Sequence, residues 1–439
     1  MTAVEPSIGS SSAEAILQAA ADLLREHPFD DIGYGQLGAQ AGVSERTVFR
    51  QFPTREHLLE RLAAWISQHG FEPPRFHSIA GLRAAVRSAF RAYDEAPGQA
   101  ALLARAETMA PVGAQDARNG TTALATELDR LFLRVAPGLS SVDRRRGVAS
   151  LLLAAGPTHW ARMRSAFDFD GASSAAVFDA VLDTTLASLR LGATVVDADG
   201  GVVPGTASTV ELTMTDAVPE PMDPLGDRHD ERNPRTTELI LTTFIELIEE
   251  LGSDDVSYKL IARRSGLGER TIARYFPTRF DLVTSLARHL ADEVFAPSHS
   301  SSVFELPIVI RESMLRFGER HELAHLAAEA STRTSHGGLP AQARRIASLV
   351  DAEAVGLESG VRAVVIARLT HLDSPAAWAT LARWHGRDVS AIADAAAWAL
   401  ESALDPLRDN ALHQARRAIG TETGVTGRSA PPPQPERGR

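Results

Sequence analysis

The sequence predicts an all-α protein made of two similar helical units in tandem. The chain has 439 residues, enough for about two to four domains. Most of it consists of Ala-, Leu- and Arg-rich stretches in which apolar residues recur every three or four positions, the spacing of amphipathic helices. The segment ERTVFRQFPTR at 45–55 returns as ERTIARYFPTR at 269–279, with eight of eleven residues identical. A repeat over so long an interval indicates a duplicated unit rather than a short-period solenoid.

The composition limits the compartment and the partners. The chain contains no Cys, which excludes disulfides and thiolate metal sites and favours a reducing compartment. It has no apolar run of 18 residues and no basic-then-apolar leader, so we expect a cytoplasmic protein without a membrane span. The formal net charge of −11 argues against a protein that coats nucleic acid with its whole surface. A local basic face can still attract phosphates, because that attraction acts over roughly a Debye length.

The repeat extends well beyond the opening motif. A shift of 224 positions aligns 16–65 with 240–289 without a gap, and a weaker echo relates PTHWARM at 157–163 to PAAWATL at 375–381. Each unit is therefore expected to contain a small helical domain followed by a larger one. The expected divisions are a three-helix domain at 13–67, a helical domain at 76–192, a linker at 193–233, a second three-helix domain at 234–294, a second helical domain at 302–412 and a tail at 413–439.

The first copy of the motif has the pattern of two short helices joined by a tight turn. Gly33 is placed to cap the first helix, and Gly42 is placed to end it, because glycine tolerates the left-handed backbone of such a turn. Ser44 can cap the second helix, in which Val48 and Phe52 face inward at i, i+4 spacing. This pattern predicts a helix-turn-helix whose second helix fits the major groove of DNA.

The opposite face of that second helix carries the candidate DNA contacts. Arg46 and Arg50 can reach guanine edges or phosphates. Thr47, together with Thr54 and Arg55 of the next helix, is placed to bind the phosphate backbone. Pro53 then breaks the helix, and Thr54 caps a third one, with Arg55 in its first turn. The candidate DNA-binding residues of the first unit are Ser44, Arg46, Thr47, Phe49, Arg50, Gln51, Thr54 and Arg55.

The second copy repeats this design with a more basic surface. Ser257 replaces Gly33 as a better cap, and Gly268 replaces Ser44. Residues 259–279 carry a net charge of +5, from six Lys and Arg and one Glu, whereas residues 35–55 carry +2, from three Arg and one Glu. We expect the second unit to supply more of the salt-dependent affinity. Its candidate residues are Lys259, Gly268, Arg270, Thr271, Arg274, Tyr275, Thr278 and Arg279.

Two segments read as connections rather than as helical domains. Residues 193–233 are rich in Gly, Pro, Thr and Asp, which predicts a linker with a short hairpin at 194–203. The Pro-rich end of the chain, from 413, is expected to be a disordered tail.

One short pattern matches a different chemistry. HELAH at 321–325 fits the zinc-protease signature, since His321 and His325 would share one helix face next to Glu322. A third ligand at Glu329 is atypically close, and the corresponding place in the first unit, QAALL at 99–103, has no such residues. We therefore prefer a structural or surface role here, with a regulatory metal site and a peptidase as the alternatives, and assign no metal, cofactor or catalytic residue.

The repeated segments resemble the tetracycline-repressor (TetR) family of bacterial transcription regulators. The resemblance depends on LGAQAGVSERTVFRQFPTREHLL and IARRSGLGERTIARYFPTRFDLV, and it is strong over 14–66 and 238–290. It implies an all-α chain, a three-helix DNA-binding domain, and a second domain that binds a small effector and dimerises through a four-helix bundle. Aromatic and Met side chains are the candidates for lining an effector pocket between helices, namely Trp160, Met163, Trp378 and Trp384.

The chain departs from the family in two ways. Family members often have a phosphate-binding Tyr at the position of Phe49 and Ala273, so Tyr275, two residues on, is a possible substitute. Ordinary members are single units that pair as homodimers, whereas this chain resembles two fused protomers. We therefore expect an intramolecular pseudo-dimer, with association of two chains as a further possibility. The linker's typical end separation of ~35 Å matches the ~34–36 Å between adjacent turns of DNA.

These observations favour a sequence-specific regulator of transcription over two alternatives. The expected protein is a transcriptional repressor that binds double-stranded DNA at the nucleoid, in the bacterial cytoplasm. An unidentified small effector is expected to release it from its operator. The outward helices differ at Ser44/Gly268, Phe49/Ala273 and Gln51/Tyr275, which predicts an asymmetric or imperfectly palindromic operator. The alternatives are a metal-dependent hydrolase that uses His321, Glu322 and His325, and a helical interaction protein whose DNA-binding units have decayed.

Overall fold

The computed structural model describes residues 12–71, 75–109, 119–191, 233–252, 256–296, 298–333, 341–354 and 356–412. Every regular element in these ranges is a helix and none is a strand, so the all-α prediction is confirmed for this part of the chain. The expected hairpin at 194–203 and the tail from 413 lie outside the described residues. In the same ranges, no helix combines the length and the apolarity that crossing a bilayer requires.

The chain begins with a small group of helices that forms its own core. A short 3₁₀ turn, η1, separates the first helix from the next two, and a longer helix then leads into the rest of the molecule. The elements are α1 (Ser12–Leu23), η1 (Phe29–Asp31), α2 (Tyr34–Ala41), α3 (Glu45–Gln51) and α4 (Arg55–His69).

A larger group of helices follows, in which α5 and α10 pack together and α6 packs on α9. Prolines stand in the first turn of α6 and α9, where a missing N–H costs no helical hydrogen bond. The elements are α5 (Ile79–Glu95), α6 (Pro97–Thr108), α7 (Asn119–Val135), α8 (Ser141–Ala155), α9 (Pro157–Phe167) and α10 (Gly171–Ser188).

The second half of the chain contains another small group and another large one. The small group is α12 (Pro234–Leu251), α13 (Tyr258–Ser265), α14 (Glu269–Tyr275) and α15 (Arg279–His289), continued by a π-helical turn, η2 (Leu290–Val294). The large group is η3 (Val303–Glu305), α16 (Leu306–Glu319), α17 (His321–Arg333), α18 (Ala341–Glu353), α19 (Ser359–Leu372), α20 (Pro375–His385) and α21 (Val389–Ala403).

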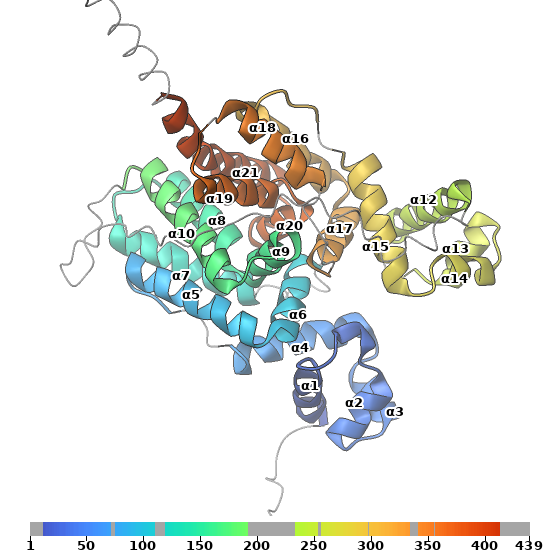
Figure 1. The fold of residues 1–439 in the computed structure, drawn as a ribbon. Coiled ribbons are helices and arrows are strands. Elements are labelled where there is room, and N and C mark those ends of the chain that lie inside the picture. Colours follow the sequence, from blue (N-terminus) through green and yellow to red (C-terminus); the bar gives the residue numbers. More distant parts are fainter. Residues whose placement is uncertain are drawn as a thin grey trace, which may run out of the picture.

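The two large groups form one body, and the two small groups project from it. In Figure 1, the cluster of α1–α3 and the cluster of α12–α14 lie at separate places on the periphery, each joined to the body through its fourth helix. Within the body, α6 packs on α17, α8 on α21 and α10 on α19. The body therefore places both small clusters where another molecule can reach them.

The apolar cores explain this division. One core is confined to the first small cluster and the adjoining face of α6, with Ile16, Leu37 and Leu62 at its centre. The core of the second half runs without a break from α12 through α21, and it includes Ala149 and Leu153 of α8. Burial of apolar side chains on both sides of the contact therefore holds the two halves together.

Candidate DNA interface

The turn between α2 and α3 depends on two glycines. Gly42 ends α2 with φ at 69°, a left-handed conformation that side chains disfavour. At Gly38, a Cβ atom would lie 2.8 Å from the carbonyl oxygen of Val43, so only glycine permits this close approach of helix and turn. Gly42 was predicted from its position, and Gly38 was not, because its role depends on the turn folding back over α2.

The orientation of α3 is determined by its cap and its buried face. The Ser44 hydroxyl accepts a hydrogen bond from the Thr47 N–H at 3.2 Å, which confirms the predicted cap. Val48 is fully buried and Phe52 is 2% exposed, as predicted. The Tyr34 hydroxyl donates to the Phe52 carbonyl oxygen at 2.9 Å and so ties the start of α2 to the end of α3. The opposite face of α3 must then point outward.

Three side chains of α3 project from that outward face. Arg46 and Arg50 are exposed, and Phe49 is 51% exposed with its ring edge-on to Tyr34 at 4.4 Å. Thr47 lies half-buried beside them, with its hydroxyl 2.9 Å from that of Ser44. Two guanidinium groups and one phenyl ring on a short helix can contact base edges, thymine methyl groups and phosphates.

The Arg55 side chain contacts its own domain, whereas the sequence placed it among the phosphate contacts. Its guanidinium donates to the Ile32 carbonyl oxygen at 2.7 Å and to the Phe29 carbonyl oxygen, and it stacks over the Phe29 ring at 4.2 Å. Burial lowers the pKa of this arginine. Arg55 therefore joins η1 to α4 within the domain, while the predicted cap of α4, Thr54, is confirmed by a hydrogen bond from the His57 N–H at 3.1 Å.

The second small cluster has the same internal framework. The Tyr258 hydroxyl donates to the Phe276 carbonyl oxygen at 2.8 Å, and burial raises the pKa of Tyr258 to about 12. Gly266 ends α13 with φ at 73°. The predicted cap Ser257 accepts from the Leu260 N–H at 3.3 Å. The same Tyr–Phe hydrogen bond and the same left-handed glycine thus orient α14 as they orient α3.

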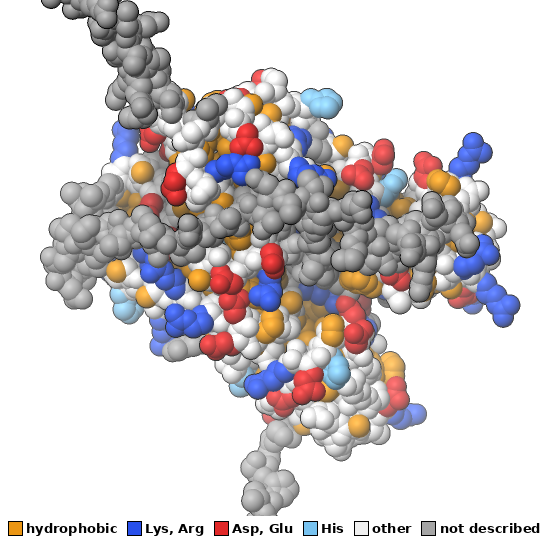
Figure 2. Space-filling model, in the orientation of Figure 1, with side chains coloured by type: hydrophobic (Ala, Val, Ile, Leu, Met, Phe, Trp, Pro, Cys, Tyr) orange, Lys and Arg blue, Asp and Glu red, His pale blue; other side chains and the backbone are white. Residues whose placement is uncertain are grey.

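The outward face of α14 is cationic and lacks a large apolar side chain. Arg270 and Arg274 are exposed, Thr271 is half-buried, and Ala273 occupies the position of Phe49. Lys259 and Arg263 of α13 are exposed beside them. Lys and Arg side chains gather at the outer end of this cluster in Figure 2. Such a surface suits a polyanion.

The remaining candidate DNA-binding residues of the second copy make contacts within their own domain or lie at helix caps. Tyr275 is 7% exposed, and its hydroxyl accepts from the Asn233 N–H at 3.3 Å, so it points toward the start of α12 rather than outward. Arg279 donates to the Val256 carbonyl oxygen at 3.1 Å, as Arg55 does to Ile32. Gly268 precedes α14 without a side-chain cap, and Thr278 forms a capping box with Asp281.

Gln51 also turns toward the first helix of its cluster. Its amide donates to the Ser12 hydroxyl at 3.1 Å. The side chains of Gln51 and Tyr275, which are at equivalent positions in the sequence, therefore both point toward the first helix of their cluster. Of the three predicted differences between α3 and α14, only Phe49/Ala273 lies on the outward face of the helix, because Ser44 and Gly268 are the N-cap residues that precede it.

The HELAH segment begins α17, which packs on α6 of the first half, and one of its histidines bonds to that half. His325 donates from Nδ1 to the Thr108 carbonyl oxygen at 2.8 Å, and burial lowers the pKa of His325 to about 4. Glu329 forms an ion pair with Arg105 at 2.6 Å, and His321 lies 3.0 Å from Glu322. No group of three or more ligand-type side chains in the described ranges is arranged to hold a metal ion. The hydrolase alternative has no support from this geometry.

The four residues proposed for an effector pocket pack within the body. Trp160 is 1% exposed and its indole donates to Asp94 at 2.9 Å, while Met163 is fully buried. Trp378 is 3% exposed, and Trp384 lies half-buried against the cores of both halves. A small cavity in the described part of the chain is lined by other residues of α8–α10, α19 and α21, namely Ser150, Leu153, Ala154, His159, Val181, Arg368, His371, Leu372 and Ala399.

A short helix that presents arginine and threonine, held by a Gly turn and backed by a buried face, defines a helix-turn-helix DNA-binding protein. The comparison with known families agrees. Residues 16–62 match the family model described as bacterial regulatory proteins, tetR family. The match supports a DNA-binding transcription regulator of the TetR type, and it covers the first small cluster. A search of curated proteins found no match to the chain.

Proposed function

We propose that the protein is a sequence-specific transcription regulator, without enzymatic activity, that binds double-stranded DNA through both α3 and α14. The observation that carries this proposal is the common framework of the two clusters. In each, a Tyr hydroxyl bonded to a Phe carbonyl and a left-handed Gly direct one Arg-Thr face outward. A structural role alone would not require two exposed arginines at matching positions in both copies.

The proposal includes an intramolecular pseudo-dimer. In a two-fold interface, a contact from one surface to another is returned in the reverse direction. Here α8 packs on α21 and α10 on α19, which occupy equivalent places in the two halves, and α6 on α20 is matched by α9 on α17. The His371 imidazole donates to the carbonyl oxygen of Leu153, its counterpart 218 positions earlier, at 2.8 Å. These reciprocal contacts support a pseudo-two-fold axis between the halves.

We further propose that the protein is a repressor that a small effector releases from its operator in the bacterial cytoplasm. Resemblance to the TetR family motivates this part of the proposal. A physical route exists in Arg105 of α6, which bonds to Glu329 of α17 and to Asp30 beside the first helix-turn-helix. A ligand that shifted α6 against α17 would act on that domain and favour one arrangement of the two DNA-reading helices over another.

Selection of bound duplexes from a random pool tests the proposal. With the full chain at fixed ionic strength, we expect enrichment of a motif with two unlike half-sites, centred about 10 base pairs apart. Recovery of random sequences, with no site preferred over bulk DNA, would contradict it. That result would favour the other alternative, a helical interaction protein with decayed DNA-binding units.

A further inference from the structure

The contact between the two halves joins equivalent positions that carry different chemistry. The shift of 224 positions holds from the small clusters into α6 and α17, because Arg87, Ala100 and Thr108 recur as Arg311, Ala324 and Thr332. The shift of 218 relates α8 to α19, α9 to α20 and α10 to α21. Side chains that face each other across the interface can therefore be compared with their own counterparts.

The clearest pair is Arg105 and Glu329, which occupy the same position in the two halves. The Nε atom of Arg105 lies 2.6 Å from Oε1 of Glu329, with side-chain exposures of 16% and 8%. Burial opposes the charge of Arg105, but the carboxylates of Glu329 and Asp30 outweigh it and raise the pKa of the guanidinium. If two first halves met in this geometry, two arginines would face each other. If two second halves met, two buried glutamates would do so.

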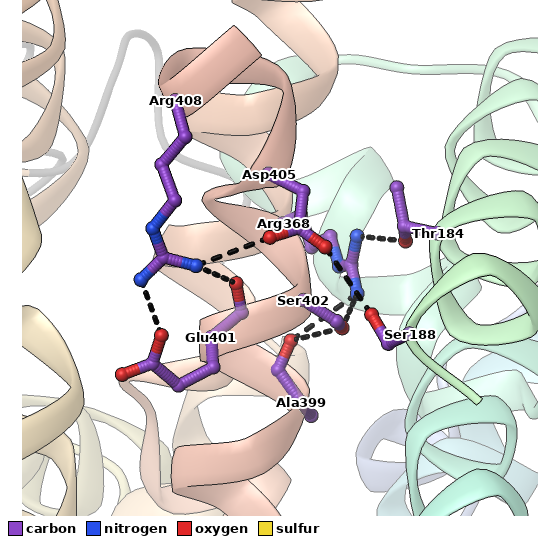
Figure 3. Close-up of polar contacts among 8 residues, drawn as sticks. All are labelled: Thr184, Ser188, Arg368, Ala399, Glu401, Ser402, Asp405 and Arg408. Carbon is purple, nitrogen blue, oxygen red and sulfur yellow. Dashed lines mark hydrogen bonds and ion pairs between the residues drawn. The ribbon is translucent and has the colours of Figure 1, made fainter. Parts of the chain in front are cut away.

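Arg368 is a second buried cation at the interface that only one of the two halves carries. Arg368 of α19 is 5% exposed and donates to the hydroxyls of Thr184 and Ser402 at 2.6 Å each. Figure 3 shows the guanidinium between α10 of the first half and α21 of the second. Thr184 and Ser402 are equivalent positions, and the counterpart of Arg368 is Ser150. Two second halves would bring two buried guanidiniums to the same pair of hydroxyls.

The end of α6 needs side chains that only the second half supplies. Arg383 of α20 donates to the carbonyl oxygens of Glu107, at 2.9 Å, and of Ala106, and His325 donates to that of Thr108. These groups satisfy the free carbonyls of a helix terminus. The counterparts of Arg383 and His325 in the first half are Ser165 and Ala101. At the equivalent end of α17, Ser165 and Arg162 donate to the Ser331 carbonyl oxygen, at 3.5 and 3.3 Å, and Ala101 has no side-chain donor. Two first halves would leave both helix ends without these donors.

We propose that this interface is specific for one first half and one second half, and that it excludes pairing of like halves. The inference rests on the proposed pseudo-dimer. Removing one partner of a buried ion pair is strongly destabilising, and placing like charges there is worse still, so unlike pairing is selected by repulsion in the wrong pairs as well as by attraction in the right one. The partner that the interface fits is therefore the complementary half, from the same chain or from a second copy.

Charge reversal in the full chain tests the stability part of the proposal. Glu329→Arg and Arg105→Glu should each lower the unfolding temperature by about 5 °C or more. The double variant should recover the part of the loss that comes from this pair, while the contact of position 105 with Asp30 remains lost. Arg362→Glu is the control for charge reversal outside the interface, because its ion pair with Asp351, also at 2.6 Å but more exposed, lies within the second half. A double variant that stays as unstable as the single ones would overturn the proposal.

Co-expression of the two single variants, with different tags, tests partner choice. Alone, each variant has like charges at the axis. Together, an exchanged two-chain complex restores an Arg–Glu pair at both interfaces. We expect tag-to-tag capture and a two-chain mass in native mass spectrometry, at least several-fold above a pair of differently tagged wild-type chains or of Arg362→Glu chains. Exchange no greater than in these controls would overturn the proposal.

The outcome is separable from that of the proposed function. Binding of the unmodified chain to a selected operator tests the regulator assignment without reference to the charge pair. If the chain binds DNA specifically but the charge variants neither lose stability nor exchange, this inference fails and the regulator assignment stands. If the charge variants behave as expected but no operator is found, the assignment fails and the unlike pairing stands.

Discussion

At the scale of single residues, the outward arginines are the first place to test DNA reading. Arg46 and Arg270 occupy equivalent exposed positions on α3 and α14. We expect Arg46→Ala and Arg270→Ala each to weaken operator binding by about 1–3 kcal/mol, or roughly 5- to 150-fold in Kd, because each removes a base or phosphate contact. Titration by fluorescence anisotropy at one salt concentration measures this. Arg130→Ala, on the exposed side of α7, is the control and should leave Kd unchanged.

The comparison of the two variants also distinguishes the units. If one of the two substitutions leaves Kd unchanged while the other does not, the silent unit is a structural part of the pseudo-dimer. If both leave it unchanged, neither helix reads DNA through this position, and the proposed interface is wrong.

A second prediction separates Arg50 from Arg55, which the sequence placed in one group. Arg55→Gln should lower the free energy of unfolding by about 2 kcal/mol, because two backbone carbonyls lose a charged donor. Arg50→Gln should leave stability unchanged and reduce the slope of log K against log salt by about 1 if it contacts a phosphate. Denaturant unfolding and binding at several salt concentrations give the two readouts. Equal effects of both variants on the salt slope would contradict the distinction.

At the scale of elements, the two glycines in the turn of the second helix-turn-helix should respond in opposite ways to substitution by serine. Gly268 has φ at −73° and room for a Cβ atom, whose nearest neighbour, Thr271 Oγ1, would lie 3.6 Å away. Gly268→Ser should therefore stabilise the protein by about 0.5 kcal/mol, through a new cap and a less flexible unfolded chain. Gly266→Ser should instead destabilise it by about 1 kcal/mol, because φ there is 73°. Chemical unfolding curves for the pair measure both signs, and stabilisation by Gly266→Ser would refute this reading of the turn.

The same elements show how far sequence reasoning reaches. The caps at Ser44, Thr54 and Ser257 and the buried face of α3 were predicted, because they depend on neighbours within four residues. The directions of Arg55 and Tyr275 were not, since each is set by a backbone group more than twenty residues away. The pairing of Arg105 with Glu329 was also out of reach, because no local pattern indicates which charged positions meet across two halves.

At the scale of the whole molecule, the fused halves should read an operator with two unlike half-sites because of the one difference on the outward faces of α3 and α14, Phe49 against Ala273. Gln51 and Tyr275 point to the first helix of their clusters, and Ser44 and Gly268 are caps, so they are not expected to distinguish bases. A phenyl ring on α3 can pack against a thymine methyl group, a contact that Ala273 is too short to reproduce.

The prediction is therefore that Phe49→Ala makes the selected operator more nearly palindromic, by relaxing the preference of one half-site toward that of the other. Ala273→Phe should produce the same convergence from the opposite side, with the new preference appearing in the second half-site. Sequencing of bound duplexes selected by the wild type and both variants measures the change base by base. Leu133→Ala, which removes an exposed apolar side chain from α7, is the control and should leave both half-sites as in the wild type. If the half-sites stay equally unlike in both variants, their difference originates in the placement of the helices by the body rather than in the residues that face the groove.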